Sequence, residues 1–83
     1  MIALTLYSRP GCHLCDDMKT IVLRVVAATP VRLTLTEVDI STDPALETQY
    51  GLEIPVLLLN GKKAAKYRVS EAELRRLLEA QTR

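Results

Sequence analysis

The stretch Ser8-Arg9-Pro10-Gly11-Cys12-His13-Leu14-Cys15 decides how the rest of this 83-residue chain is interpreted. Its two cysteines are three positions apart and are the only cysteines in the sequence. Residues 2–7, just before it, have apolar side chains at every second position, which predicts a strand. The residues that follow Gly11 have apolar side chains at helical spacing, which predicts a helix. Because Pro10 and Gly11 supply the turn, the cysteine pair is expected where a strand leads into a helix.

This position favours a reactive Cys12. We expect Cys12 at or just before the first helical turn, where backbone N–H groups lack intrahelical partners and the helix dipole is positive. Both features stabilise a thiolate, which is the reactive form of cysteine. Cys15 follows one turn later, close enough to attack a mixed disulfide on Cys12. The sequence therefore predicts two catalytic residues, Cys12 as the nucleophile and Cys15 as the resolving thiol.

The charged neighbours of the pair each allow two interpretations. His13 either tunes the thiolate, because a protonated ring lowers the pKa of Cys12, or is a solvated residue of the first helical turn. Arg9 either attracts the Cys12 thiolate or a substrate carboxylate, or is a solvated loop charge. Asp16 and Asp17 suit the positive end of the helix dipole but oppose a thiolate. The sequence alone does not decide between the two interpretations of any of these residues.

Composition excludes several classes of protein. Residues 1–83 are enough for a single domain with one modest core. The net charge of +1 gives no indication of nucleic acid or an anionic membrane as a partner. No apolar run approaches the ~18 residues of a membrane span, and the first strand meets Arg9-Pro10 too soon for a signal peptide. We expect a soluble, cytoplasmic monomer, in which two cysteines at redox spacing indicate a working pair rather than a structural staple.

The next two elements follow from proline positions and alternation. The helix that begins at the cysteines is expected to run to about Ala28, because Pro30 makes the preceding residue a poor helical one. Residues 31–40 predict a second strand, which the long helical crossover makes parallel to the first. Its alternation slips near Thr36–Glu37, which indicates either a bulge or burial of both faces.

The middle of the chain predicts a short helix and a buried strand. Asp43 is expected to cap the helix with Pro44 as its first residue. Gly51 suits a left-handed position at the end of this helix. Residues 54–59 are nearly all apolar and predict a central strand, with Pro55 tolerated at its entrance.

The last third predicts a hairpin and a final helix. Asn60-Gly61 is a strong hairpin signal, so an antiparallel fourth strand is expected from Lys62 to about Tyr67. Ser70 and Glu73 form a capping box for the last helix. Three leucines of that helix are expected to face the sheet: Leu74, Leu77 and Leu78. The order is thus β-α-β-α-β-β-α, an α/β protein with a mixed four-stranded sheet flanked by helices.

This order, with Cys-x-x-Cys after the first strand and Pro55 opening the third, resembles the thioredoxin superfamily. Residues 7–15 are most similar to its short glutaredoxin-like branch, and the resemblance covers nearly the whole chain. It implies a thioredoxin-like fold and a cis Ile54–Pro55 bond that faces the cysteines. Such a bond would present the backbone of Ile54 to an extended substrate. Three residues are therefore expected to bind substrate: Arg9, Ile54 and Pro55.

The resemblance also implies an activity. It implies an enzyme, a thiol-disulfide oxidoreductase with no bound cofactor, whose Cys12/Cys15 pair exchanges electrons with disulfide-containing proteins or low-molecular-weight disulfides. Either the glutathione system or thioredoxin reductase would supply the electrons.

The sequence departs from its relatives at several positions. Glutaredoxins commonly carry Pro-Tyr between the cysteines, where this chain has His13-Leu14. They carry Gly-Gly and then Asp before the last helix, where this chain has Ala65-Lys66 and Val69, so half of a glutathione site is altered. Thioredoxins carry a buried carboxylate and a Trp where this chain has Leu6 and Gly11. We therefore expect weak glutathione binding.

Other interpretations of the two cysteines remain beside this one. They could be inert buried side chains, or part of a redox-silent interaction module that keeps the fold. Zinc needs about four ligands, and only His13 can join the two sulfurs within one chain, so no metal site is expected. A copper carrier is a further alternative, but carriers with this motif have β-α-β-β-α-β order. Four cations near the fourth strand indicate either a soluble sheet edge or a docking patch for an acidic partner: Lys62, Lys63, Lys66 and Arg68.

Overall fold

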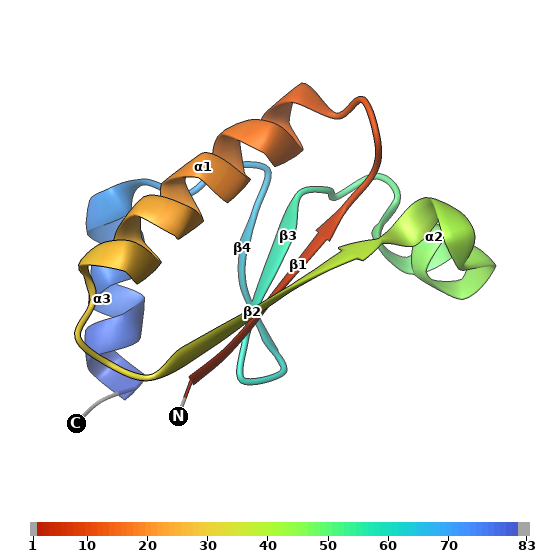
Figure 1. Cartoon of the computed structure of the whole chain (residues 1–83). Helices are drawn as coiled ribbons and strands as arrows, with labels where there is room; N and C mark the ends of the chain where they lie inside the picture. Colours follow the sequence, from red (N-terminus) through yellow and green to blue (C-terminus); the bar gives the residue numbers. More distant parts are fainter. Residues whose placement is uncertain (1, 82–83) are drawn as a thin grey trace.

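A computed structural model describes residues 2–81 and confirms the expected order of strands and helices (Figure 1). The elements are β1 (Ile2–Ser8), α1 (His13–Ala28), β2 (Leu33–Asp39), the 3-10 turn η1 (Ile40–Thr42), α2 (Pro44–Tyr50), β3 (Val56–Leu59), β4 (Lys62–Lys66) and α3 (Glu71–Gln81). Helix α1 ends at Ala28 as expected. No helix within the described residues is long and apolar enough to cross a membrane.

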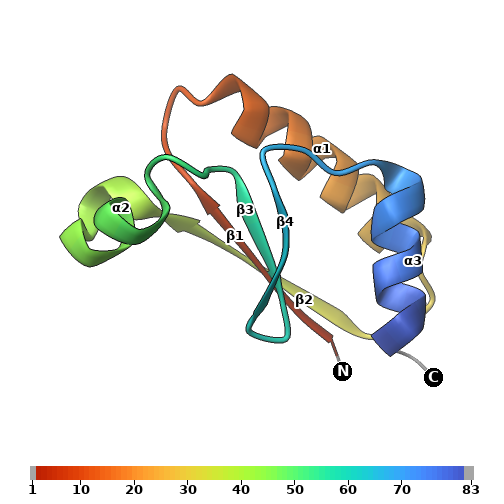
Figure 2. The ribbon, with the colours of Figure 1, turned by 180° about the vertical axis from the view of Figure 1, so that it is seen from behind.

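The four strands form one mixed sheet in the order β2-β1-β3-β4. β1 pairs with β2 in parallel and with β3 antiparallel, and β3 pairs antiparallel with β4. Helices α1 and α3 lie together on one face of the sheet, and α2 lies apart from them beside the end of β2 (Figures 1 and 2). β1 is therefore a central strand, and its carboxyl end leads directly into the cysteine loop.

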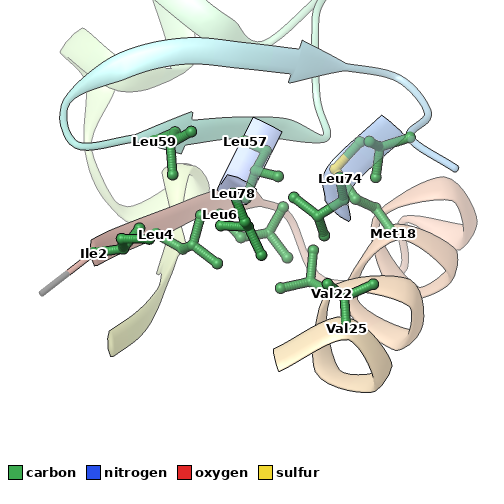
Figure 3. Packing of buried hydrophobic residues seen from close by; sticks show 11 residues of the cluster. Ile2, Leu4, Leu6, Met18, Val22, Val25, Leu57, Leu59, Leu74 and Leu78 are labelled. Carbon is green, nitrogen blue, oxygen red and sulfur yellow. The ribbon is translucent and has the colours of Figure 1, made fainter. Parts of the chain in front are cut away.

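The core lies between the sheet and the layer formed by α1 and α3 (Figure 3). Alternate residues of β1 and one stripe each of α1 and α3 meet there. The buried cluster comprises Ile2, Leu4, Leu6, Met18, Val22, Val25, Leu57, Leu59, Val69, Leu74 and Leu78. Leu77 is half-buried and packs against this cluster. Because a slip of one residue would turn these β1 side chains outward, the core sets the register of the central strand.

The structure of β2 shows that neither a bulge nor burial of both faces, the two expected explanations of its slipped alternation, is correct. Its register with β1 is unbroken from Leu33 to Asp39, so it has no bulge, and Thr36 and Glu37 are exposed, so it is not buried on both faces. By alternation Glu37 shares the face of Leu33, which is the face that α1 covers. Its carboxylate lies 3.3 Å from the ammonium of Lys19 on α1. The pattern slips because an ion pair replaces an apolar contact there.

Helix α2 confirms the expected N-cap but corrects the expected role of Gly51. The Asp43 carboxylate accepts a hydrogen bond from the backbone N–H of Ala45 at 3.0 Å. Gly51 has right-handed angles, φ −54° and ψ −31°, rather than left-handed ones. A Cβ on Gly51 would collide with the backbone oxygen of Glu47 and lie 3.3 Å from the Arg9 guanidinium. Close packing, not backbone conformation, therefore requires glycine at this position.

The hairpin and the last helix form as expected. Asn60 and Gly61 both have left-handed φ angles, 51° and 84°, as a two-residue hairpin turn requires. The backbone N–H of Glu73 donates to the Ser70 hydroxyl at 3.1 Å, and this hydroxyl donates to the Glu73 carboxylate at 3.2 Å. One feature was not expected: the β3–β4 register shifts between Leu57 and Leu58.

We predict that Gly51→Ala destabilises the protein by about 1–3 kcal/mol, because the added methyl group overpacks the contact with Glu47 and Arg9. Alanine is ordinarily the better helix former, so a loss isolates the collision. Urea unfolding measures the free energy. Gly61→Asn is the control, since asparagine tolerates a left-handed φ and no atom lies within 4 Å of a Cβ there. Equal stability of Gly51→Ala and the parent chain would contradict this account.

Candidate functional site

The two cysteines form a disulfide at the amino end of α1. Cys12 is the N-cap of the helix, and its Sγ accepts a hydrogen bond from the backbone N–H of Cys15 at 3.1 Å. The two Cα atoms are 5.2 Å apart. Cys12 is half-buried, whereas Cys15 is only 3 % exposed. The expected position of the pair at the start of the helix is confirmed, and Cys12 is the more accessible residue of the two.

The loop between β1 and α1 is held by its own backbone. The N–H of Cys12 donates to the carbonyl oxygen of Arg9 at 3.2 Å, and Gly11 between them has a left-handed φ of 79°. Glycine adopts this angle without steric cost. The carbonyl oxygen of Cys12 then accepts the N–H of Asp16, also at 3.2 Å, and starts the helix. The sequence Arg-Pro-Gly-Cys thus builds the turn that orients the first sulfur.

Pro55 lies at the same end of the sheet as the cysteine loop. The Ile54–Pro55 bond is cis, as the resemblance implied. Val56, the next residue, is paired with Tyr7 near the end of β1, so the segment before β3 and the loop after β1 adjoin (Figures 1 and 2). The N–H of Ile54 already donates to the carbonyl oxygen of Tyr50 at 3.1 Å. The N–H of Ile54 is therefore already engaged within the protein.

Arg9 interacts with two carboxylates, Glu47 on α2 and Asp39 at the end of β2. Its guanidinium forms an ion pair with Glu47, and sequence reasoning missed this partner. The pKa of Asp39 is lowered chiefly by hydrogen bonds from Ser41, and the charge of Arg9 lowers it further. No sequence signal could have found Glu47, because it lies 38 positions from Arg9 and belongs to a different element. The positive charge expected beside the cysteines is thus already partly neutralised.

His13 is the first residue of α1, and its side chain is 89 % exposed. Its Nε2 lies 3.6 Å from the Asp17 carboxylate one turn along the helix. This contact fits a solvated residue of the first turn. A protonated His13 would be balanced in part by Asp17, which weakens its effect on a Cys12 thiolate.

A second group of side chains fixes the segment that precedes Pro55. The Glu53 carboxylate accepts a hydrogen bond from Lys63 at 2.6 Å and lies 4.0 Å from Lys66. This bond lowers the pKa of Glu53 and raises that of Lys63. The Lys63 ammonium also lies 5.9 Å from the ring centre of Tyr50, which stacks on Tyr7 at 4.6 Å. At least two of the edge-strand lysines therefore have structural partners.

Two cavities border the cysteine loop. One, of about 290 Å³, is lined by charged side chains, by Cys15 and by residues of the loop itself. The other, of about 340 Å³, extends from Leu14 to the segment between β4 and α3. Within residues 2–81 no cluster of three or more Cys, His, Asp or Glu residues could hold a metal ion.

Comparison with known proteins agrees with this geometry. The glutaredoxin-like domain family (DUF836) matches residues 3–79. The crystal structure of the structural-genomics target protein XcR50 from X. campestris is 35 % identical, with a TM-score of 0.77, over 93 % of this chain and 96 % of that one. Thioredoxin-2, described as a component of the malaria parasite protein secretion machinery, is 20 % identical and has a TM-score of 0.72, over 96 % of this chain and 82 % of its own.

No curated protein matched the chain. The malarial thioredoxin-2 shows the fold alone, which is the expected thioredoxin-like one. The family match spans nearly all of the described residues, and XcR50 matches along almost its whole length. With its Cys-x-x-Cys disulfide at the start of α1, this chain belongs to the glutaredoxin-like domain family (DUF836).

Proposed function

We propose that this protein is a thiol-disulfide oxidoreductase that cycles Cys12 and Cys15 between dithiol and disulfide. The observation that carries the proposal is the asymmetry of the pair. Cys12 is the accessible N-cap of α1, whereas Cys15 is buried behind it and already within bonding distance. An exposed attacking sulfur with a protected resolving sulfur is the arrangement that disulfide exchange requires.

The reaction consists of two exchange steps. In the first, the Cys12 thiolate attacks one sulfur of a substrate disulfide, which breaks the substrate S–S bond and expels one substrate thiolate. In the second, the Cys15 thiol loses its proton to solvent and its sulfur attacks Cys12 Sγ. The second substrate thiolate leaves, and the Cys12–Cys15 disulfide forms. Two electrons pass from the dithiol to the substrate, and a reductant must return them before the next cycle.

The residues near Pro55 supply a docking edge for an extended substrate. The Ile54 carbonyl oxygen accepts a hydrogen bond from the substrate backbone, since the Ile54 N–H is already bonded to Tyr50. Pro55 is buried at the head of β3, and its own carbonyl oxygen accepts the N–H of Tyr67 at 2.8 Å. Arg9 contributes a long-range attraction for an anionic group, reduced by Glu47.

The surroundings of the altered glutathione half-site favour a protein reductase as electron donor. Val69 is 4 % exposed and offers no acceptor for the amino group of glutathione. Ala65 is half-buried within β4, where its Cβ hinders close approach of a ligand to the backbone. The Arg9 guanidinium forms an ion pair with Glu47, which makes it less available to a carboxylate of glutathione. We therefore assign thioredoxin reductase, or a reductase like it, as the main donor, with glutathione as a slow substitute.

The proposed cellular location follows from the redox cycle of the cysteine pair. A pair that is reduced in every cycle suits the cytoplasm, where reductases keep thiols reduced. The protein acts there as a monomer on disulfide-containing proteins, without a bound cofactor and without nucleic-acid or membrane partners.

We predict that Cys12→Ser abolishes disulfide exchange, whereas Cys15→Ser accumulates a persistent mixed disulfide with substrate, because the resolving sulfur is missing. Mass spectrometry of the variants after incubation with an excess of an oxidised peptide measures the adduct. Limited alkylation of the reduced parent chain by iodoacetamide should also modify Cys12 before Cys15. Faster modification of Cys15, or an adduct that persists only in Cys12→Ser, would reverse the assignment.

We predict that glutathione reduces the oxidised protein slowly. One missing charge-assisted hydrogen bond weakens binding by about 1.5–3 kcal/mol, which is roughly tenfold to a hundredfold in affinity. Turnover with glutathione and glutathione reductase should therefore fall below turnover with thioredoxin reductase under matched substrate. A dithiol glutaredoxin run in the same assay is the control for an active glutathione system. Efficient turnover at millimolar glutathione would overturn this prediction.

A further inference from the structure

The segment 52–55, which leads from α2 into β3, is bonded along its backbone to Tyr67. Tyr67 follows β4 and donates its N–H to the Pro55 carbonyl oxygen at 2.8 Å. Its hydroxyl donates to the Leu52 carbonyl oxygen at 3.1 Å. One residue thus bridges the two ends of the segment that contains Ile54, the proposed contact for the substrate backbone.

Tyr67 makes these bonds in a backbone conformation that tyrosine rarely adopts. Its φ angle is 67°, in the left-handed region that favours glycine and asparagine. A bulky residue persists there only when surrounding contacts fix it, and such residues concentrate at functional sites. Glycine would keep the N–H bond to Pro55 without strain but would lack the hydroxyl. The hydroxyl bond to Leu52 is therefore a contribution of tyrosine that glycine cannot make.

The register shift in the β3–β4 hairpin brings two lysines to the same segment. Lys63 and Lys66 lie opposite alternate residues of β3, so both share one face of the sheet although they are three positions apart. In a regular strand such residues would lie on opposite faces, and a bulge re-aims side chains in this way. Both ammonium groups therefore reach the Glu53 carboxylate, Lys63 at 2.6 Å and Lys66 at 4.0 Å.

We propose that Tyr67 and Lys63 are positioning residues, which hold segment 52–55 in the conformation in which Ile54 receives a polypeptide substrate. This inference rests on the proposed oxidoreductase function. Both residues act through the segment, Tyr67 through its backbone and Lys63 through the Glu53 side chain. The Lys63 and Glu53 side chains are 44 % and 28 % exposed, so dissolved salt reaches this ion pair and weakens it.

The competing interpretation is that the lysines only protect the edge strand β4 from pairing with another chain. Under that interpretation every lysine of β4 is equivalent, and removal of any one of them leaves the reaction with substrate unchanged. Under the proposal Lys63 differs from Lys62, an exposed lysine of the same strand that forms no ion pair within residues 2–81. This difference is what a test must measure.

The test compares an uncharged peptide with a small disulfide on the same reduced protein. The peptide has a single cysteine linked by a disulfide to thionitrobenzoate, and the reference is the mixed disulfide of mercaptoethanol with thionitrobenzoate. The Cys12 thiolate attacks the peptide or mercaptoethanol sulfur and expels coloured thionitrobenzoate. Cys15 then loses its proton to solvent and displaces the bound thiol. Only the peptide has a backbone that can dock on Ile54, so the ratio of the two second-order rate constants measures docking.

Two variants each remove one of the proposed bonds. Tyr67→Phe keeps the ring and loses only the hydroxyl bond to Leu52, and Lys63→Met loses the ion pair with Glu53. Each should lower the peptide-to-reference ratio about twofold to tenfold, the range for the net contribution of one hydrogen bond. Because both rates come from one protein, a change in Cys12 reactivity or in the folded fraction cancels.

Two controls and one change of condition separate the ion pair from the charge of the strand. Lys62→Met removes a charge from β4, and Lys63→Arg keeps a cation beside Glu53, so both should keep the parent ratio. Added salt should lower the ratio of the parent chain, because it screens the pair. The same salt should have a smaller effect on Lys63→Met, in which this pair is already lost.

The possible outcomes separate this inference from the function on which it rests. If neither substrate releases thionitrobenzoate in a Cys12-dependent reaction, the oxidoreductase function itself is wrong. If both substrates react but Tyr67→Phe or Lys63→Met keeps the parent ratio, the positioning inference alone fails. It also fails if Lys62→Met lowers the ratio as much as Lys63→Met does, because the charge of the strand rather than the bond to Glu53 would then set the rate.

Discussion

The hydrogen bond from the Cys15 N–H to Cys12 Sγ is the interaction on which the rest of this site depends. It makes a cysteine the N-cap of α1, a position ordinarily occupied by Ser, Thr, Asp or Asn. The sulfur reaches this position because β1 is pinned by neighbours on both sides and by its buried leucines. The buried strand β1 thus fixes the position of the Cys12 sulfur at the start of α1. The unpaired N–H groups at this helix terminus favour a negative charge on that sulfur.

Much of the fold could be predicted because its signals are local. The alternation of β1, the stripe of α1, the Asn60-Gly61 turn and the Ser70–Glu73 capping box each involve residues close in sequence, and all form as expected. The end of β2 could not be predicted from its own residues. Glu37 lies on the face of the strand that α1 covers and pairs with Lys19 at 3.3 Å, a partner on another element that the strand's own pattern does not reveal.

The features of the candidate site also fall into those that could be predicted from the sequence and those that could not. The cysteine pair is a local motif, and its position was predictable, whereas the cis Ile54–Pro55 bond was expected only from the resemblance to the thioredoxin superfamily. The partner of Arg9 was not predictable, because Glu47 meets Arg9 only after α2 has folded against the cysteine loop. Likewise, nothing in the sequence around the lysines of the fourth strand predicted the hydrogen bond from Lys63 to Glu53. Pairing of charges across elements is a tertiary property, and it determines how much positive charge remains available beside the sulfurs.

The central claim is that the start of α1 stabilises a Cys12 thiolate despite the acidic residues near it. The most direct measurement is the absorbance of the thiolate at 240 nm as a function of pH, in a Cys15→Ser variant that leaves one sulfur to titrate. We expect a pKa well below the ordinary cysteine value of about 8.5. A pKa at or above that value would contradict the account, because the carboxylates would then outweigh the helix terminus.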